Sequence, residues 1–193
     1  MISLKKGLSG KKIVLAASRK TEEMSVLVEK QGGIPLVRSL QGTVFQADGE
    51  VKPILKETIQ NGFDWAIFTT GIGTQALINI AEELSLKEDF LTQLNKANVA
   101  ARGYKTFAVL SKLGLKPDVK DEDGTVAGLI EQLKGISFAG KRVLVQLHGE
   151  NVPSLIAFLQ KGGATVIEVL PYQHVPPEKK TMDQLIAELK QGR

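Results

Sequence analysis

Four short loops contain most of the residues in this chain that could do chemistry, and each follows an apolar run. The loops are Ser18-Arg19-Lys20, Thr69–Gly73, Ala101–Thr106 and His148-Gly149-Glu150. Backbone N–H groups at a helix start bind anions with help from the helix dipole. Positive charge in these loops comes from Arg19, Lys20, Arg102 and Lys105. Small residues in any one loop are explained by turn formation. The four loops together predict an anionic ligand, a phosphate or a polycarboxylate.

One of these loops also fits a nucleotide-binding pattern. Gly71–Ala76 matches G-x-G-x-x-G/A, the phosphate-binding turn between a strand and a helix in dinucleotide-binding proteins. That pattern requires an acidic residue at the end of the next strand to hold a ribose, and Arg102 stands there instead. Because an arginine suits a 2′-phosphate, a nucleotide-binding α/β protein remains an alternative.

Other candidate catalytic residues are sparse. The chain has no cysteine and only two histidines, His148 and His174, whose spacing matches no metal site, so we expect no metal. It contains neither a G-x-S-x-G nucleophile motif nor a G-x-x-x-x-G-K-[ST] phosphate loop. Tyr172 is one of two tyrosines. It is either a proton donor in a cleft or a residue that packs at a strand edge.

An internal repeat indicates which elements position the loops. The segment Gly10–Leu40 aligns without a gap with the segment that starts at Gly140, 130 residues later. Each copy contains an apolar run, a helical stretch that ends in Gly-Gly, and a second apolar run. We expect Ser18 or Thr21 to cap the first helix and Gly32-Gly33 to end it. A strand–helix–strand unit that occurs twice predicts two similar α/β domains.

The residues between the two copies complete one of these domains. From Glu50 to Val166, strand-like and helix-like segments alternate, which predicts a parallel sheet with helices on both faces. We expect domain 2 to span residues 41–170. Domain 1 then combines residues 1–40 with residues 171–193.

Two extended crossings connect the expected domains. Arg38–Phe45 leaves domain 1 and Ile167–Val175 returns to it, so we expect a two-stranded linker with a ligand cleft beside it. The strand that begins near Phe63 has no counterpart in the second copy, because its counterpart would begin at residue 193. We therefore expect domain 1 to be incomplete, with its C-terminal share missing.

Charge and hydropathy exclude some classes of protein. The net charge is +4, and the 25 lysines and arginines are spread along the chain, so we expect a solvated surface rather than a nucleic-acid partner. Ile13–Ala17 is too short for the core of a signal peptide, and no run is long enough for a membrane helix. We expect a cytoplasmic protein with no membrane partner.

Four motifs, in this order along the chain, resemble those of uroporphyrinogen-III synthase. They are Phe68–Gly73 (FTTGIG), Ala101–Thr106 (ARGYKT), Gln146–Glu150 (QLHGE) and Leu170-Pro171-Tyr172 (LPY). The likeness runs from Gly10 to the end of the chain, and it is nearest to the bacterial branch with TTGIG, ARGxK and QLHG in these places.

The resemblance implies an α/β fold of two flavodoxin-like parallel-sheet domains joined by a two-stranded linker, the first of them incomplete. It also implies cofactor-free cyclisation of hydroxymethylbilane to uroporphyrinogen III with inversion of ring D. The enzyme is then a lyase of tetrapyrrole biosynthesis. The substrate is a linear tetrapyrrole with eight carboxylates, which agrees with the basic loops.

The resemblance also assigns roles to residues. Tyr172 matches the tyrosine favoured as the acid for hydroxide departure, and the positions of Thr70, Gly71, Gly103 and Thr106 contact substrate. With the charged and glycine-containing loops, the predicted binding residues are Arg19, Thr70, Gly71, Arg102, Gly103, Lys105, Thr106, His148 and Gly149. We expect no cofactor and a monomer when complete. A regulatory ligand-binding protein derived from this fold is a further alternative.

Overall fold

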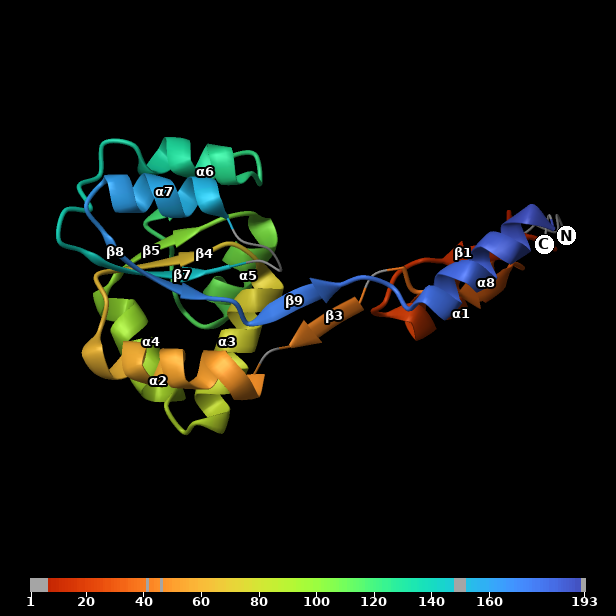
Figure 1. Ribbon diagram of the computed structural model, residues 1–193, viewed down its shortest axis with the longest axis horizontal. Helices are drawn as coiled ribbons and strands as arrows, with labels where there is room; N and C mark the ends of the chain where they lie inside the picture. The colour runs from red at the N-terminus through yellow and green to blue at the C-terminus, as the bar shows by residue number, and fades with distance from the viewer. Residues whose placement is uncertain (1–6, 41, 46, 148–151, 192–193) are drawn as a thin grey trace, which may run out of the picture. The chain divides into compact units, whose positions relative to one another are not determined.

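The computed structural model describes residues 7–40, 42–45, 47–147 and 152–191. The chain divides into two compact units (Figure 1). The larger unit is Phe45–Gln173, and the smaller unit combines Met1–Val44 with His174–Arg193. None of the helices in the described ranges is long and apolar enough to cross a membrane.

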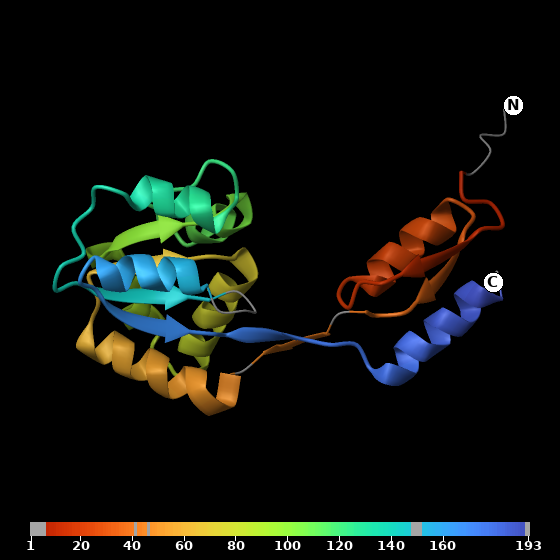
Figure 2. The ribbon, with the colours of Figure 1, turned by 45° about the horizontal axis from the view of Figure 1, so that its top comes forward.

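A five-stranded parallel sheet forms the centre of the larger unit (Figure 2). Its strands are β4 (Trp65–Phe68), β5 (Asn98–Ala101), β6 (Val119–Lys120), β7 (Arg142–Gln146) and β8 (Thr165–Val169). They lie in the order β6-β5-β4-β7-β8. Counted from β7, where the repeat begins, this order is 2-1-3-4-5, the flavodoxin-like order. The unit is therefore a circularly permuted version of that arrangement.

Helices cover both faces of this sheet, as predicted from the alternating pattern. They are α2 (Lys52–Asn61), α3 (Gly71–Glu83), α4 (Lys87–Lys96) and α5 (Tyr104–Lys112), then α6 (Val126–Leu133) and α7 (Pro153–Lys161). A π-helical turn, η1 (Ala47–Val51), precedes α2. Figure 1 shows α6 and α7 on the face opposite α2 and α4.

The side chains of β4 alternate between two cores, so all four are buried. Ala66 and Phe68 join the core under α2, α3, α4 and α5. Trp65 and Ile67 join the core under α6 and α7, where Trp65 packs edge-on against Phe138. A strand buried on both faces shows a continuous apolar run, as Trp65–Phe68 does.

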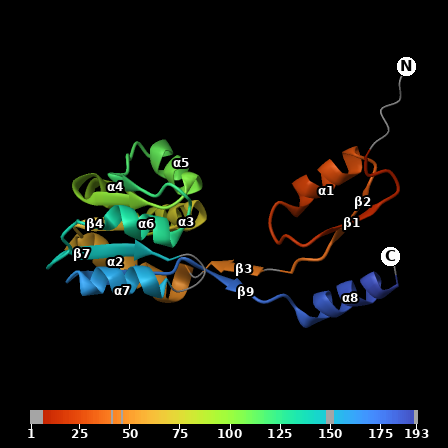
Figure 3. The same ribbon diagram turned by 90° about the horizontal axis from the view of Figure 1, so that it is seen from above.

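In the smaller unit, β1 (Lys12–Leu15) pairs in parallel with β2 (Ile34–Val37), and α1 (Thr21–Lys30) connects them. Figure 3 shows α1 lying along the two strands. β1 and β7 begin 130 residues apart, as the repeat predicts, and Gly32 follows the helix with a φ of 81°, the left-handed conformation that glycine adopts readily. The prediction that Ser18 or Thr21 caps α1 is wrong. Lys20 occupies the N-cap and makes no side-chain capping bond.

The segments that connect the units are β3 (Gly42–Phe45) and β9 (Tyr172–Val175), which pair as a two-stranded sheet. The division between the compact units passes through both strands, after Val44 and after Gln173. Tyr172, the first residue of β9, therefore belongs to the larger unit.

An ion pair joins the last helix to the small sheet. Glu188 in α8 (Lys179–Lys190) accepts two hydrogen bonds from Arg38, from Nε at 2.9 Å and from Nη2 at 2.5 Å. The hydrogen bonds from Arg38 lower the pKa of the Glu188 carboxyl, and burial acts in the opposite direction. Both side chains are mostly covered, and a bidentate pair of this kind is geometrically specific.

The pair makes the docking of α8 depend on pH. A carboxylate with a lowered pKa stabilises the folded state above its unfolded pKa of about 4.3, and this contribution is lost as the pH falls through the lower folded value. We expect Glu188→Gln to lower the hydrogen-exchange protection of α8 at pH 6, and the unsubstituted protein to approach the variant as the pH falls below about 4. The control is Glu29→Gln, which converts an exposed carboxylate in the same unit to an amide. Equal protection of α8 in both proteins at pH 6 would refute a role for the pair.

Candidate functional site

The carboxyl ends of β4, β5 and β7 meet at one edge of the five-stranded sheet. Phe68 pairs with Ala101 on one side and with Gln146 on the other, so the loops that follow these strands are neighbours. The topological switch lies here, because the chain continues from β4 to β5 on one side and reaches β7 later on the other. Ligands of open parallel sheets bind at this kind of edge.

The first of these loops contains Thr70, the N-cap of α3. Its hydroxyl oxygen accepts a hydrogen bond from the Gly73 N–H at 3.2 Å, and its carbonyl oxygen accepts one from the Thr74 hydroxyl at 2.8 Å. The next residue, Gly71, allows α3 to approach α5 closely. A Cβ atom at Gly71 would lie 2.7 Å from the carbonyl oxygen of Lys105.

Tyr172 reaches the same helix start from β9. Its hydroxyl lies 3.2 Å from the Thr70 hydroxyl, and its side chain is buried. The structure thus brings together two predicted site residues that are 102 positions apart in the chain. Proton donation by this phenol stays a prediction.

Gln146, at the end of β7, supports this loop from beneath and was not among the predicted site residues. Its side-chain oxygen accepts hydrogen bonds from the N–H groups of Thr69 and Thr70, at 3.2 and 3.1 Å. Its side-chain nitrogen donates to the Thr70 hydroxyl at 3.3 Å and also to the Leu147 carbonyl. The sequence contains a signal for it, namely a polar residue at the end of an otherwise apolar strand.

Arg102 links the loop after β5 to the loop after β4, because its Nε donates to the Thr69 carbonyl at 2.9 Å. Burial lowers the pKa of the Arg102 guanidinium, while the nearby Asp121 carboxylate and Tyr172 phenol raise it. An arginine stays charged at neutral pH, so a positive charge lies near the Tyr172 hydroxyl.

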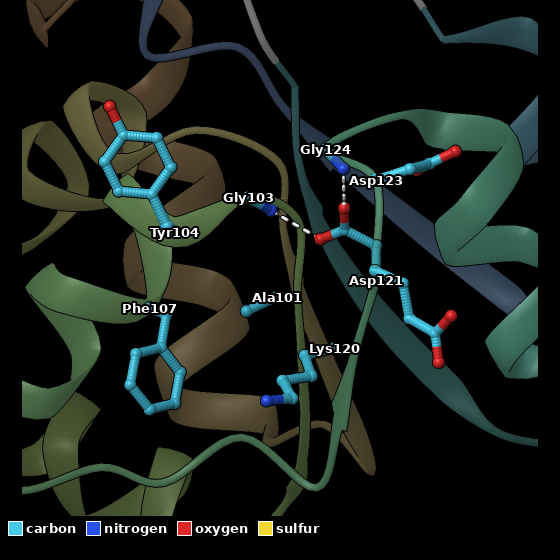
Figure 4. Close-up of a pocket in the computed structure, with 9 residues that line it drawn as sticks. Ala101, Gly103, Tyr104, Phe107, Lys120, Asp121, Asp123 and Gly124 are labelled. Carbon is cyan, nitrogen blue, oxygen red and sulfur yellow. Dashed lines mark hydrogen bonds between the residues drawn. The ribbon is translucent and has the colours of Figure 1, made fainter.

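A pocket of about 500 Å³ opens between the loop after β5 and the loop after β6. The Asp121 carboxylate bridges these loops by accepting hydrogen bonds from the Gly103 N–H, at 2.5 Å, and from the Gly124 N–H. Figure 4 shows the rings of Tyr104 and Phe107 on the other side of the pocket from Asp121. Both rings are exposed, at 78% and 41%. None of the acidic residues in this loop was among the predicted site residues.

The remaining predicted residues lie in different surroundings. Lys105 lies over the Tyr104 ring, with its Nζ 5.8 Å from the ring centroid. Thr106 is buried, and its hydroxyl has no hydrogen-bond partner among the described residues. Arg19 is exposed in the smaller unit. His148 and Gly149 lie outside the described residues. In the described part of the chain, no group of three His, Cys, Asp or Glu side chains could hold a metal ion.

Sequence comparison decides the family. A family described as uroporphyrinogen-III synthase HemD matches residues 22–193. The chain belongs to this family. Among curated proteins, it is 52% identical over 184 residues to the uncharacterized protein YjjA of Bacillus subtilis, a match that covers 95% of this chain and 68% of that protein. It is 25% identical to a putative uroporphyrinogen-III synthase of Methanothermobacter thermautotrophicus, over 90% of this chain and 66% of that protein.

Solved structures of the uroporphyrinogen-III synthase family share the fold. One structure of the synthase from Thermus thermophilus, a mutant form, is 28% identical, with a TM-score of 0.73 over 94% of this chain and 69% of that chain. The wild-type enzyme in another crystal form is 30% identical, with a TM-score of 0.66 over 94% of this chain and 68% of that one. The chain thus spans about two thirds of the length of these relatives.

The glycines of the nucleotide-like motif have structural reasons of their own. Gly71 permits the contact with Lys105, and a Cβ atom at Gly73 would collide with the side chain of Gln146, only 2.5 Å from its Cδ. In a dinucleotide site, by contrast, glycines give the pyrophosphate room to approach. Packing within this family's fold therefore accounts for the motif without a nucleotide.

The bridge made by Asp121 is testable by mutation. We expect Asp121→Ala to leave the N–H groups of Gly103 and Gly124 without their acceptor, and to lower the free energy of unfolding of the larger unit by about 1–3 kcal/mol. Denaturation followed by the emission of Trp65, the only tryptophan, measures it. Glu122→Ala, at the exposed neighbour, should change it by less than about 0.5 kcal/mol. Equal effects of both substitutions would contradict the bridge.

Proposed function

We propose that this protein is a uroporphyrinogen-III synthase, which closes linear hydroxymethylbilane to uroporphyrinogen III and inverts the last pyrrole ring. Membership of the family supports the proposal, as does the similarity to Thermus thermophilus enzymes that bear this name. The reaction is a lyase-type cyclisation with loss of water. It requires no cofactor, and we expect the protein to act on this small molecule as a cytoplasmic monomer.

The observation that carries the proposal is the contact between Tyr172 and Thr70 at the start of α3. The first step removes the hydroxyl group from the end ring of the substrate and leaves an azafulvene. A departing hydroxyl needs a proton, and the O–H group of a tyrosine is a donor that can supply it. The pyrrole at the opposite end of the substrate, ring D, then attacks the azafulvene carbon through its already substituted α-carbon and forms a spiro intermediate. The bond from that α-carbon to its old bridge breaks and re-forms at the other α-carbon, where a proton is lost, and this gives the inverted ring.

The carboxylates of the substrate require positive charge and N–H donors around this contact. The N-termini of α3 and α5 lie at the same edge of the sheet as Arg102 and Lys105. Helix N-termini favour anions, and basic residues beside them strengthen that preference. The acidic loop at Asp121 disfavours carboxylates, so the pocket suits the uncharged face of a pyrrole ring against Tyr104 and Phe107.

Removal of the Tyr172 hydroxyl tests the catalytic role. We expect Tyr172→Phe to lower kcat by about 10²–10⁴-fold, because general-acid help of that size is lost, and to change KM little, because the ring and its packing remain. Spontaneous closure gives the uninverted isomer I, so the ratio of isomer III to isomer I is the sensitive measurement. Ser111→Ala, which removes an exposed hydroxyl from the far end of α5, is the control.

Two results would count against this function. Isomer III formed at the parent rate by Tyr172→Phe would leave Tyr172 with a packing role only. Tight binding of the substrate by the unsubstituted protein without any turnover would favour the alternative, a ligand-binding protein built on this fold.

The positive charges give a second test. We expect the double substitution Arg102→Ala and Lys105→Ala to raise the KM for hydroxymethylbilane roughly 3- to 30-fold at low salt, from about 0.3–1 kcal/mol for each charge at a helix N-terminus. The effect should shrink at high salt, since exposed charges are screened. Lys112→Ala with Lys116→Ala removes the same charge from exposed positions and is the control. A KM that is unchanged at low ionic strength would remove both residues from the site.

A further inference from the structure

Gln146 is a buried polar residue whose side-chain amide makes four hydrogen bonds. Three of them go to the loop that precedes α3. The Thr69 hydroxyl also donates to the Gln146 carbonyl at 2.7 Å, so the strand end holds the loop through both its side chain and its backbone. A fully satisfied buried network of this kind holds its members in one arrangement.

The orientation of this amide is decided by its neighbours. Oxygen and nitrogen of a glutamine side chain are distinguished by what they bond to. The N–H groups of Thr69 and Thr70 both point at one side-chain atom of Gln146, and a backbone N–H can only donate, so that atom is the oxygen. The side-chain nitrogen therefore faces Thr70 Oγ1, with the Leu147 carbonyl as its second acceptor.

A count of donors and acceptors at the Thr70 hydroxyl likewise gives the direction of its hydrogen bond with Tyr172. A hydroxyl oxygen has two lone pairs and one proton. At Thr70 the lone pairs accept from the Gly73 N–H and from the Gln146 side chain, so the hydroxyl proton is left for Tyr172. Thr70 is then the donor, and the phenol oxygen of Tyr172 is the acceptor. The proton of Tyr172 is not used in this bond.

We propose that Gln146 is a positioning residue: by donating to Thr70 it makes Thr70 donate to Tyr172, which keeps the Tyr172 proton directed away from Thr70. This inference rests on the proposed function, in which that proton goes to the departing hydroxyl of the substrate. The bond from Thr70 also supports the negative charge that develops on the phenol oxygen as its proton leaves.

The isosteric substitution Gln146→Glu reverses the bond. An ionised carboxylate has no proton to donate, so the Thr70 hydroxyl would turn to the carboxylate, and Tyr172 would donate to Thr70. Gln146→Met keeps the length of the side chain but removes the donor, which leaves the direction of the bond unset. Gly73→Ala keeps Gln146 but displaces its amide from the Thr70 hydroxyl, because the added Cβ would lie 2.5 Å from Gln146 Cδ and 2.9 Å from Thr70 Oγ1.

The first measurement does not depend on the reaction. With only two tyrosines in the chain, ¹³Cζ labelling gives two NMR signals, and the 78% exposed Tyr104 is an internal reference. We expect Gln146→Glu and Gly73→Ala to move the Tyr172 signal while the Tyr104 signal stays in place. Gln160→Met, an exposed glutamine at the end of α7, should move neither. A Tyr172 signal unchanged in both Gln146→Glu and Gly73→Ala would overturn the proposal, whether or not the protein turns over substrate.

The second measurement is the partition between products. We expect Gln146→Glu to lower kcat on the order of 10²-fold, to leave KM within about twofold and to raise the share of isomer I, as for a misplaced acid. Lowering the pH protonates the glutamate, which restores a donor, so the isomer ratio should return toward that of the parent at the same pH. Unchanged Trp65 emission shows that a variant is folded. If Gln146→Glu does not fold, Gly73→Ala and Gln146→Met decide by the same ratio, and a parent-like ratio in both would refute the proposal.

Discussion

The parallel pairing of β4 with both β5 and β7 is the constraint on which the rest of the site depends. Parallel strands end at one edge, so Phe68, Ala101 and Gln146 terminate side by side and the loops that follow them must share space. The loop before α3 is therefore held from two directions, by Arg102 on one side and by Gln146 on the other. A change in the register of either pair would separate these partners.

Close approach at this edge also explains why small residues gather there. Because they lack a Cβ atom, Gly71 leaves room for the backbone of Lys105 and Gly73 leaves room for the side chain of Gln146. The glycines are thus part of the packing that places Thr70, and through it Tyr172, at the start of α3. In other α/β proteins a short glycine-containing turn of this kind binds phosphate. In this chain the N–H groups of Thr69 and Thr70, just before the glycines, donate to the side chain of Gln146.

The same strand–helix–strand element occurs in both compact units, with different neighbours in each. In the smaller unit it forms β1, α1 and β2, and in the larger unit it forms β7, α7 and β8. In the larger unit β7 pairs with β4, so the element extends an existing sheet and its strand is buried on both faces. The polar end of β7, Gln146, is consequently buried at the switch point, where the fold places ligands.

The repeat, the alternation of strands and helices, and the loops rich in glycine and hydroxyl residues were predictable from the sequence pattern. The roles expected for Tyr172 and Thr70 came from the resemblance to the family. The sequence could not show that Tyr172 and Thr70 touch, because the two residues lie 102 positions apart and their meeting depends on the order of five strands. Nor could it show that Asp121 bridges two glycine N–H groups or that Gln146 orients Thr70. The bonds between Gln146 and Thr70 depend on the register in which β7 pairs with β4. At α1 the sequence favours a side-chain cap, but the structure has none. Residue types and their periods thus determined the elements of this protein. The contacts of Thr70 with Tyr172 and Gln146, and of Arg102 with Thr69, were decided only by the tertiary structure, since each joins segments that lie far apart in the chain.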